Sequence, residues 1–392
     1  MGLFRFRGTA LVSGEIPLGV LYSVTGTYSL IGQACLDGAR LGLEEVNRDP
    51  RYPFAFRAEI GDPGANIDLY HALSENMLRE RGCRHIIGTI TSIIEKHDAL
   101  LWYMCPYEGF ECCENVIYTG ASPNQHIVPL FRYLLPRFGK KAYLVGSNYI
   151  WGWETNRTAR ELVQASGGKV VGEKYLAFSS LDVDRLIEDI REQQPDFVLN
   201  NLVGTTSYAF LAAYHAAAKD DPAFAPDNRP VVSCNFTEAE LGSVGSSATG
   251  LISTAIYFDS LEQPESRAFR QRVAERFGAA RRNSVYLINA YIAVKLLAEA
   301  ILACGSDEIE AVKEALFALE LDTPLGPMRI DSRTNHAALR PYIGRLEADG
   351  HFKIIEAAEE PIAADPYLVD FDAQVFAADI NRRATTPLRV VK

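Results

Sequence analysis

Short apolar runs alternate with longer amphipathic runs along most of the chain, and this alternation restricts the possible folds most strongly. Near the start, residues 17–23 (PLGVLYS) read as a buried strand, and residues 30–48 carry apolar side chains at helical spacing. A second set begins with a predicted helix over 126–139 and a strand over 141–147. Alternating strands and helices predict an α/β fold with two doubly wound parallel-sheet lobes, a ligand cleft between them and multiple crossovers.

The length of 392 residues exceeds what one hydrophobic core normally holds, which also favours two lobes. Late in the chain come three predicted helices and a hairpin with Asp349-Gly350 at its turn, so we expect the chain to cross between lobes repeatedly. The predicted division is an N-terminal extension (1–15), lobe 1 (16–122 plus about 252–330), lobe 2 (about 123–251 plus 331–365) and a C-terminal tail (366–392).

Composition excludes several classes of function. The formal charge is -11 and no long basic run occurs, so direct binding to nucleic acid is not expected. We see no apolar stretch near the roughly 20 residues that span a bilayer and no clear secretory signal. This predicts a cytoplasmic protein, or a periplasmic one if an export signal has been removed.

The seven cysteines form no CxxC pair and no metal-like spacing with histidine, so neither a metal nor a cofactor is predicted.

Five predicted strand-to-helix junctions share one chemistry: hydroxyls, an amide and aromatic rings, with no Asp, Glu, Lys, Arg or His. They cover 23–29, 89–92, 102–107, 147–153 and 204–208. Ligands of open α/β sheets bind beyond the carboxyl ends of the strands. We therefore predict a site for a small, neutral, polar molecule. Ser92 and Thr205 also suit helix N-caps, and this alternative stays open, as does core packing for Trp151.

Cys105 raises the question of catalysis, because it follows a predicted strand at one of these junctions. A catalytic thiol needs a lowered pKa from a helix N-terminus or a nearby cation. Here Pro106 follows and no helix pattern begins, and the chain contains neither a GxSxG elbow nor a P-loop. We interpret the cysteines as small, buried apolar residues and predict that the protein is not an enzyme.

Several longer motifs carry a family resemblance: PYEGFE (106–111), PNQ (123–125), GSNYIWGWETN (146–156), VGTTS (203–207) and EEPIAADPYLV (359–369). With them the chain resembles type I periplasmic-binding proteins of the branched-chain amino acid, urea and amide group. Within that group it is most similar to the amide receptors that negatively regulate aliphatic amidase operons. The resemblance runs from about Ile16 to about Asp370.

The resemblance implies two lobes joined by three crossovers, which close over a ligand. It places ligand contacts at Ser92, Tyr103, Cys105, Pro106, Tyr149 and Trp151, and Thr205 joins this set through its junction. The amide receptors carry Tyr, Thr and Tyr where this chain has Ile90, Cys105 and Trp151. Fewer hydrogen-bond donors and more apolar surface imply a ligand larger than acetamide, such as a longer aliphatic amide or an aromatic one.

Two functions follow from the resemblance. The first is a sensor for a small neutral amide or urea that controls an amidase or nitrile-degradation operon by lobe closure. It would act through an antiterminator partner that makes the RNA contact, and homo-oligomerisation is left open. The alternative is the substrate-binding protein of an ABC importer for urea, short-chain amides or branched-chain amino acids. An amino acid would need an acidic partner for its ammonium group, for which Glu108 and Glu238 are the candidates.

Overall fold

The computed structural model describes residues 13–89, 94 and 98–385, which form two compact units. Unit 1 holds the described residues up to Cys105, with Cys112–Ala121 and Leu261–Leu339. Unit 2 holds Pro106–Glu111, Ser122–Ser260 and the described residues from Arg340 onward. The chain therefore passes between the units five times, after residues 105, 111, 121, 260 and 339. The resemblance implies three passages; the short excursion at 106–111 adds the other two.

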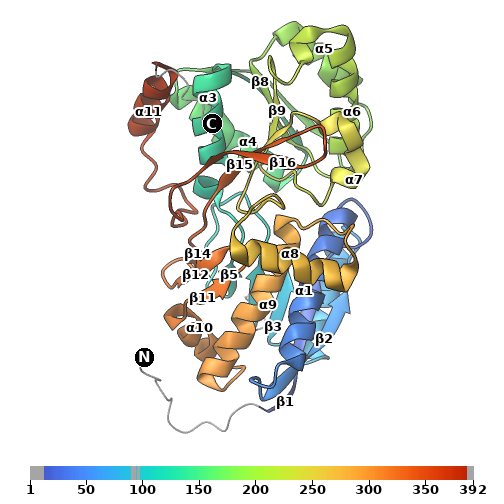
Figure 1. Cartoon of the computed structure of the whole chain (residues 1–392), viewed down its shortest axis with the longest axis vertical. Helices are drawn as coiled ribbons and strands as arrows, with labels where there is room; N and C mark the ends of the chain where they lie inside the picture. Colours follow the sequence, from blue (N-terminus) through green and yellow to red (C-terminus); the bar gives the residue numbers. More distant parts are fainter. Residues whose placement is uncertain (1–12, 90–93, 95–97, 386–392) are drawn as a thin grey trace. The chain divides into compact units, whose positions relative to one another are not determined.

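Unit 1 is built on a seven-stranded sheet with helices on its faces (Figure 1). All neighbouring strands pair in parallel except β13 and β14, which are antiparallel to each other. The strand order is β13 (Ile330–Asp331), β14 (His336–Ala337), β5 (Val116–Tyr118), β4 (Leu100–Tyr103), β3 (His85–Gly88), β1 (Gly14–Leu21) and β2 (Phe54–Gly61). Its helices are α1 (Ser29–Arg48), α2 (Ile67–Arg79), α8 (Pro264–Phe277), α9 (Val285–Cys304) and α10 (Ile309–Ala318). A separate antiparallel pair joins β11 (Leu321–Thr323) to β12 (Gly326–Met328).

Helix α9 is the centre of the unit 1 core and lies against α1 (Figure 1). Close approach of the two helices requires a glycine, because a Cβ on Gly38 would stand 1.9 Å from the Leu287 carbonyl oxygen. Contrary to the sequence-based expectation, α9 is long and apolar enough to cross a membrane. Most of its apolar window is buried inside unit 1, however, as in the core helix of a water-soluble fold. In the sequence this apolar stretch is interrupted by three polar residues, Asn289, Lys295 and Glu299, so its full length was not recognised.

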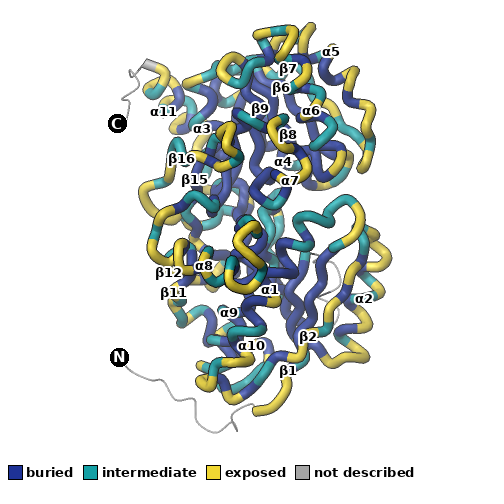
Figure 2. Tube along the Cα trace, turned by 45° about the vertical axis from the view of Figure 1, so that its right-hand side comes forward, coloured by how far each residue is buried: buried dark blue, intermediate teal, exposed yellow. Residues whose placement is uncertain are grey.

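Unit 2 repeats the architecture with a second seven-stranded sheet, whose central strands are buried in Figure 2. The order is β16 (Phe352–Ala357), β15 (Tyr342–Leu346), β10 (Ile252–Ala255), β9 (Val231–Ser233), β8 (Phe197–Asn201), β6 (Lys141–Ser147) and β7 (Lys169–Leu176). Strands β15 and β16 form the predicted hairpin, and β15 pairs antiparallel to β10. The larger helices are α3 (Ile127–Phe138), α4 (Ile150–Ala165), α5 (Asp184–Gln193) and α6 (Thr205–Asp220), followed by the single turn α7 (Leu241–Val244). Two doubly wound, mostly parallel sheets confirm the predicted fold class.

Two unit boundaries differ from the predicted ones. Strand β10 was assigned to lobe 1, but it pairs with β9 and β15 in the sheet of unit 2, and the chain changes unit only after Ser260. Likewise β13 and β14 were assigned to lobe 2, but β14 pairs with β5 of unit 1. The correction has a simple cause: a local pattern identifies a strand, whereas hydrogen bonds to distant strands decide which sheet it joins.

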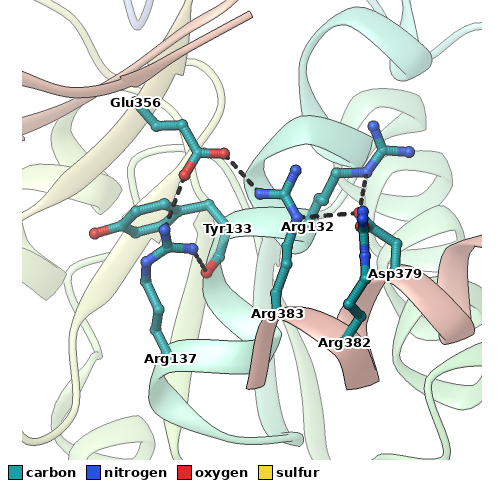
Figure 3. Close-up of polar contacts among 7 residues, drawn as sticks. All are labelled: Arg132, Tyr133, Arg137, Glu356, Asp379, Arg382 and Arg383. Carbon is teal, nitrogen blue, oxygen red and sulfur yellow. Dashed lines mark hydrogen bonds and ion pairs between the residues drawn. The ribbon is translucent and has the colours of Figure 1, made fainter. Parts of the chain in front are cut away.

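The predicted C-terminal tail contains a docked helix, α11 (Ala373–Thr385), which contacts α3 and α4. Phe376 and Ile380 are fully buried beneath it. Its Asp379 carboxylate forms ion pairs with Arg132 of α3 at 3.3 Å and with Arg382 at 2.7 Å (Figure 3). Arg383 bonds to Glu356 at 3.0 Å, and Arg137 reaches the other oxygen of the same carboxylate at 3.0 Å. An apolar face and a charged rim thus hold the helix on unit 2.

Candidate strand-end sites

At the strand ends of unit 1, a hydroxyl network through Tyr70 of α2 links Ser23 and Thr89, which belong to two of the predicted junctions. The Ser23 hydroxyl donates to the Tyr70 hydroxyl at 2.9 Å and accepts from the Ala65 backbone N–H at 2.8 Å. The Tyr70 hydroxyl lies 3.3 Å from the Thr89 hydroxyl. Burial raises the pKa of Tyr70, so this phenol stays neutral near pH 7. The Asp62 carboxylate accepts from the Thr25 hydroxyl and from the Val24 backbone N–H, and these bonds hold its own loop.

Two predicted contact residues belong to unit 1. Tyr103 ends β4, is half-buried, and stacks at a tilt on Tyr118 with ring centroids 6.1 Å apart. Cys105 follows, is half-buried, and shares a side-chain hydrogen bond with Cys35, whose pKa is raised mainly by burial and further by this bond. Cys105 thus lies beside the neutral thiol of Cys35, which is neither a base nor a cation. That arrangement agrees with a packing role and supplies nothing that would activate a nucleophile.

Unit 2 carries the other described candidates, at the ends of β6 and β8. Tyr149 caps α4 and packs against Phe178 at 4.8 Å, and Trp151 in the first turn is only 5% exposed. Thr205 is the exposed first residue of α6, and Gly204 takes the N-cap position, so Thr205 is not the N-cap that the alternative reading suggested. Below them, Asn201 donates to Asn156 at 2.8 Å, and the Val203 backbone N–H donates to the Ser147 hydroxyl at 3.0 Å. These buried amides and hydroxyls hold the loops above the sheet.

Pro106 opens the 106–111 excursion, which is anchored inside unit 2. The Phe110 backbone N–H donates to the Pro366 carbonyl at 2.8 Å, and the Phe110 ring packs on Tyr367 and beneath the Arg157 guanidinium, 4.3 Å from the ring centroid. Next to it, Gln125 donates to the Ile362 carbonyl at 2.7 Å. Four of the sequence motifs therefore meet in one place: PYEGFE, PNQ, the helix after GSNY, and EEPIAADPYLV.

Ile90 and Ser92 lie outside the described residues, so these two predicted contacts stay predictions. The predicted contacts also leave out His126, the N-cap residue of α3, which is 1% exposed and whose ring centroid lies 5.6 Å from that of Trp151. Its position directly after the PNQ motif was the only available signal.

The two acids considered for an ammonium group differ in their surroundings. Glu108 is half-buried, and burial raises its pKa. Glu238 is 3% exposed and accepts from the Asp259 backbone N–H at 2.8 Å. A third acid, Glu240, is 1% exposed, and burial raises its pKa to about 8; it accepts from Tyr208 and from the Thr237 backbone N–H, both at 3.3 Å. Within the described part of the chain, no group of three or more His, Cys, Asp or Glu could hold a metal ion.

The model of the periplasmic binding protein domain family matches residues 16–372, nearly the whole chain. The chain belongs to the periplasmic-binding-protein family. Its members bind solutes and are not enzymes, in agreement with the prediction of no catalysis.

Relatives of this periplasmic-binding-family chain cover it almost end to end. A Leu/Ile/Val-binding protein homolog from Brucella abortus (strain 2308) is 22% identical over 362 residues, which are 88% of this chain and 90% of that protein. Among solved structures, a solute-binding protein of an ABC transporter from Rhodopseudomonas palustris HaA2, in complex with p-hydroxybenzoic acid, is similar with a TM-score of 0.79 at 19% identity. That match covers 91% of this chain and 99% of that one.

An amino acid ABC transporter substrate-binding protein from Pseudomonas fluorescens Pf-5 is similar with a TM-score of 0.75 at 17% identity, over 90% of this chain and 97% of that one. At these sequence identities the structural matches show the fold alone. They do not specify a solute for this chain.

Proposed function

We propose that this chain is the solute-binding protein of an ABC importer and that its solute is a small, uncharged or aromatic molecule. The observation that carries the proposal is the family match over residues 16–372, together with full-length relatives of the Leu/Ile/Val-binding kind. A ligand that binds the closed form better than the open form would shift the protein toward the closed form. The importer would then distinguish loaded from empty protein.

The chemistry of the described strand ends supports a neutral or aromatic group on the ligand. Tyr103, Tyr149 and Trp151 supply rings, and hydroxyl groups supply orientation without formal charge. In unit 1 Asp62 is bound to its own loop. In unit 2 Glu238 and Glu240 are buried and already accept backbone hydrogen bonds, and burial raises the pKa of the half-buried Glu108, which disfavours its charged form. A free amino acid needs an acid that is available to its ammonium group. We therefore rank branched-chain amino acids below aromatic acids and amides as solutes.

A second candidate is an amide sensor that controls an amidase or nitrile-degradation operon through an antiterminator partner. It is favoured by the cluster of PYEGFE, PNQ and EEPIAADPYLV in unit 2, the motifs on which the resemblance to amide receptors depends. The two candidates differ in compartment, since the importer subunit belongs in the periplasm and the sensor in the cytoplasm.

Calorimetry with a panel of leucine, urea, acetamide, benzamide, benzoate and 4-hydroxybenzoate tests the binding proposal. We expect saturable one-to-one binding of at least one aromatic probe and none of leucine; tight leucine binding alone would overturn our ranking. Cell fractionation of the native organism and co-purification with a permease then test the importer. Ligand-dependent release of a co-expressed antiterminator would instead establish the sensor.

A further inference from the structure

Two ring nitrogens in unit 2 are buried and have no hydrogen-bond partner among the described residues. They are Nδ1 of His126 and Nε1 of Trp151, whose side chains are 1% and 5% exposed and whose rings lie 5.6 Å apart. A buried polar atom without a partner destabilises the fold, so such atoms are normally paired. Two such nitrogens on neighbouring rings, one of them close in sequence to the candidate Tyr149, indicate that a hydrogen-bonding group of a ligand belongs between them.

The hydrogen bond of the other His126 nitrogen determines what this group must be. Burial lowers the pKa of His126 to about 4, so the imidazole is neutral at physiological pH. Its Nε2 lies 2.9 Å from the Tyr107 carbonyl oxygen. A carbonyl only accepts, so Nε2 carries the hydrogen and Nδ1 is left as an acceptor. The indole Nε1–H of Trp151 can only donate. The two atoms therefore require opposite partners.

We propose that His126 and Trp151 form a subsite for a neutral ligand group that donates one hydrogen bond and accepts another, either a hydroxyl or a primary carboxamide. A hydroxyl oxygen accepts from Trp151 while its hydrogen goes to His126, and a carboxamide uses its oxygen and its nitrogen. A carboxylate has no hydrogen for His126 and is disfavoured. This inference rests on the proposed solute-binding function and specifies which part of the solute unit 2 recognises.

Unit 1 supplies an internal comparison. His85 and Trp102 are fully buried, their rings lie 6.4 Å apart, and the same two nitrogens lack partners among the described residues. His85 begins β3, however, so the histidine of this pair lies at the amino edge of its sheet, away from the strand ends where ligands bind, although Trp102 is the third residue of β4 and stands in register with Ile87. A buried water would satisfy that pair. The indole N–H of Trp102 therefore serves as the control for an indole that is bonded to a buried water and to no ligand.

The test compares benzamide with benzoate, which share a ring but differ in the donor, and 4-hydroxybenzoate with 4-methoxybenzoate, which lacks the hydroxyl hydrogen. We expect Trp151→Phe and His126→Leu each to weaken benzamide or 4-hydroxybenzoate binding about tenfold, the effect of one lost hydrogen bond to a buried group. His126→Leu should change the binding of benzoate or 4-methoxybenzoate less than twofold, because neither the carboxylate nor the methoxy group has a hydrogen for Nδ1. His126→Asn should recover part of the loss, because its amide can donate to Tyr107 and still offer an acceptor.

Trp153→Phe is the matched control, since Trp153 lies on the same helix, is 45% exposed and already donates to Asn148 at 3.0 Å. In nitrogen-15 NMR, the indole signal of Trp151 should shift on addition of benzamide while that of Trp102 stays in place. If a probe binds the wild type and the His126 and Trp151 variants equally well, the subsite is wrong and solute binding stands. If no probe binds and no indole signal moves, both are wrong and an ordered water is the occupant.

Discussion

The backbone N–H of Phe110 donates to the carbonyl of Pro366, and this 2.8 Å bond joins the 106–111 excursion to the last part of unit 2. The preceding residue, Gly109, has φ +81° and no room for a side chain. A Cβ there would lie 2.6 Å from Pro123 Cγ and 2.7 Å from the Pro366 oxygen. The junction of the sequence motifs thus depends on one glycine.

Gly109→Ala should lower the free energy of unfolding of unit 2 by about 2–4 kcal/mol, combining left-handed backbone strain with a steric clash. Gly167→Ala is the control, because Gly167 also lies in unit 2 with positive φ (+78°) but meets nothing within 4 Å. Gly167→Ala should lower the free energy of unfolding only by the left-handed backbone strain, about 1 kcal/mol. Urea denaturation measures both; equal losses would show that packing at the junction contributes nothing.

Asp379→Asn should loosen the docking of α11 by about 1 kcal/mol at pH 7, because it removes the charge shared by Arg132, Arg382 and Arg383. Burial alone would raise the pKa of Asp379, but the bond from Arg382 and the neighbouring arginines outweigh it and lower the pKa. A carboxyl with a lowered folded pKa stabilises above its unfolded value and loses this effect as the pH falls through the folded value.

The Asp379 variant and the wild type should therefore converge as the pH falls from the ordinary value of 3.8 through the lower pKa of the folded state. Hydrogen exchange of the α11 amides reports the docking directly. The control is Glu75→Gln, which breaks an exposed helical pair with Arg79 and should change the free energy of unfolding by less than about 0.5 kcal/mol. If α11 exchanges equally fast in the Asp379 variant and the wild type at pH 7, the ion pairs do not hold it.

Glu240→Gln should stabilise the protein increasingly as the pH rises from 5 to 8. Burial raises the pKa of Glu240 to about 8, against an ordinary value of 4.5. Between these values the folded state keeps a proton that the unfolded chain has lost, so wild-type stability falls with rising pH. Glutamine removes this penalty, with a gain at pH 8 on the order of 3 kcal/mol. Urea denaturation at the two pH values measures it, and the exposed Glu347→Gln should show no such trend.

The seven thiols should divide into two reactive and five protected ones. Cys105 and Cys112 are half-buried, whereas the others are buried: Cys35, Cys83, Cys113, Cys234 and Cys304. Burial also raises the pKa of Cys83 to about 12 and raises that of Cys234. Since the thiolate is the reactive form, an Ellman assay at pH 8 should show at most two fast thiols, and seven after denaturation. A third fast thiol would contradict the packing role that we assign to the cysteines.

Cys105→Ser should retain ligand binding within about threefold, because the position would contribute shape and weak polarity, not a covalent bond. Calorimetry with the probe that binds the wild type most tightly measures this. Burst kinetics or product formation that Cys105→Ser abolishes would restore the enzyme hypothesis.

The sequence predicted those features of the fold that depend on residues close together in the chain. Strand and helix periods predicted α1, α9 and the β15–β16 hairpin, because a period depends only on neighbouring side chains. Partner choice is not local, so β10 and β14 were assigned to the wrong lobes. Trp151 was recognised as a candidate from its helix-start position. His126 was not, because its tautomer and its burial depend on Tyr107 and Trp151, which reach it only through folding.

The five passages of the chain between the units have a practical consequence for anyone dissecting this protein. Unit 1 is assembled from three pieces and unit 2 from three others, interleaved along the chain. No single cut in the backbone releases either one whole, and a truncation after residue 260 would leave β10 without its neighbour β15. An isolated half would have to be engineered by joining pieces that are separate in the sequence. During synthesis, unit 1 is complete only at residue 339, and unit 2 only with the segment that follows.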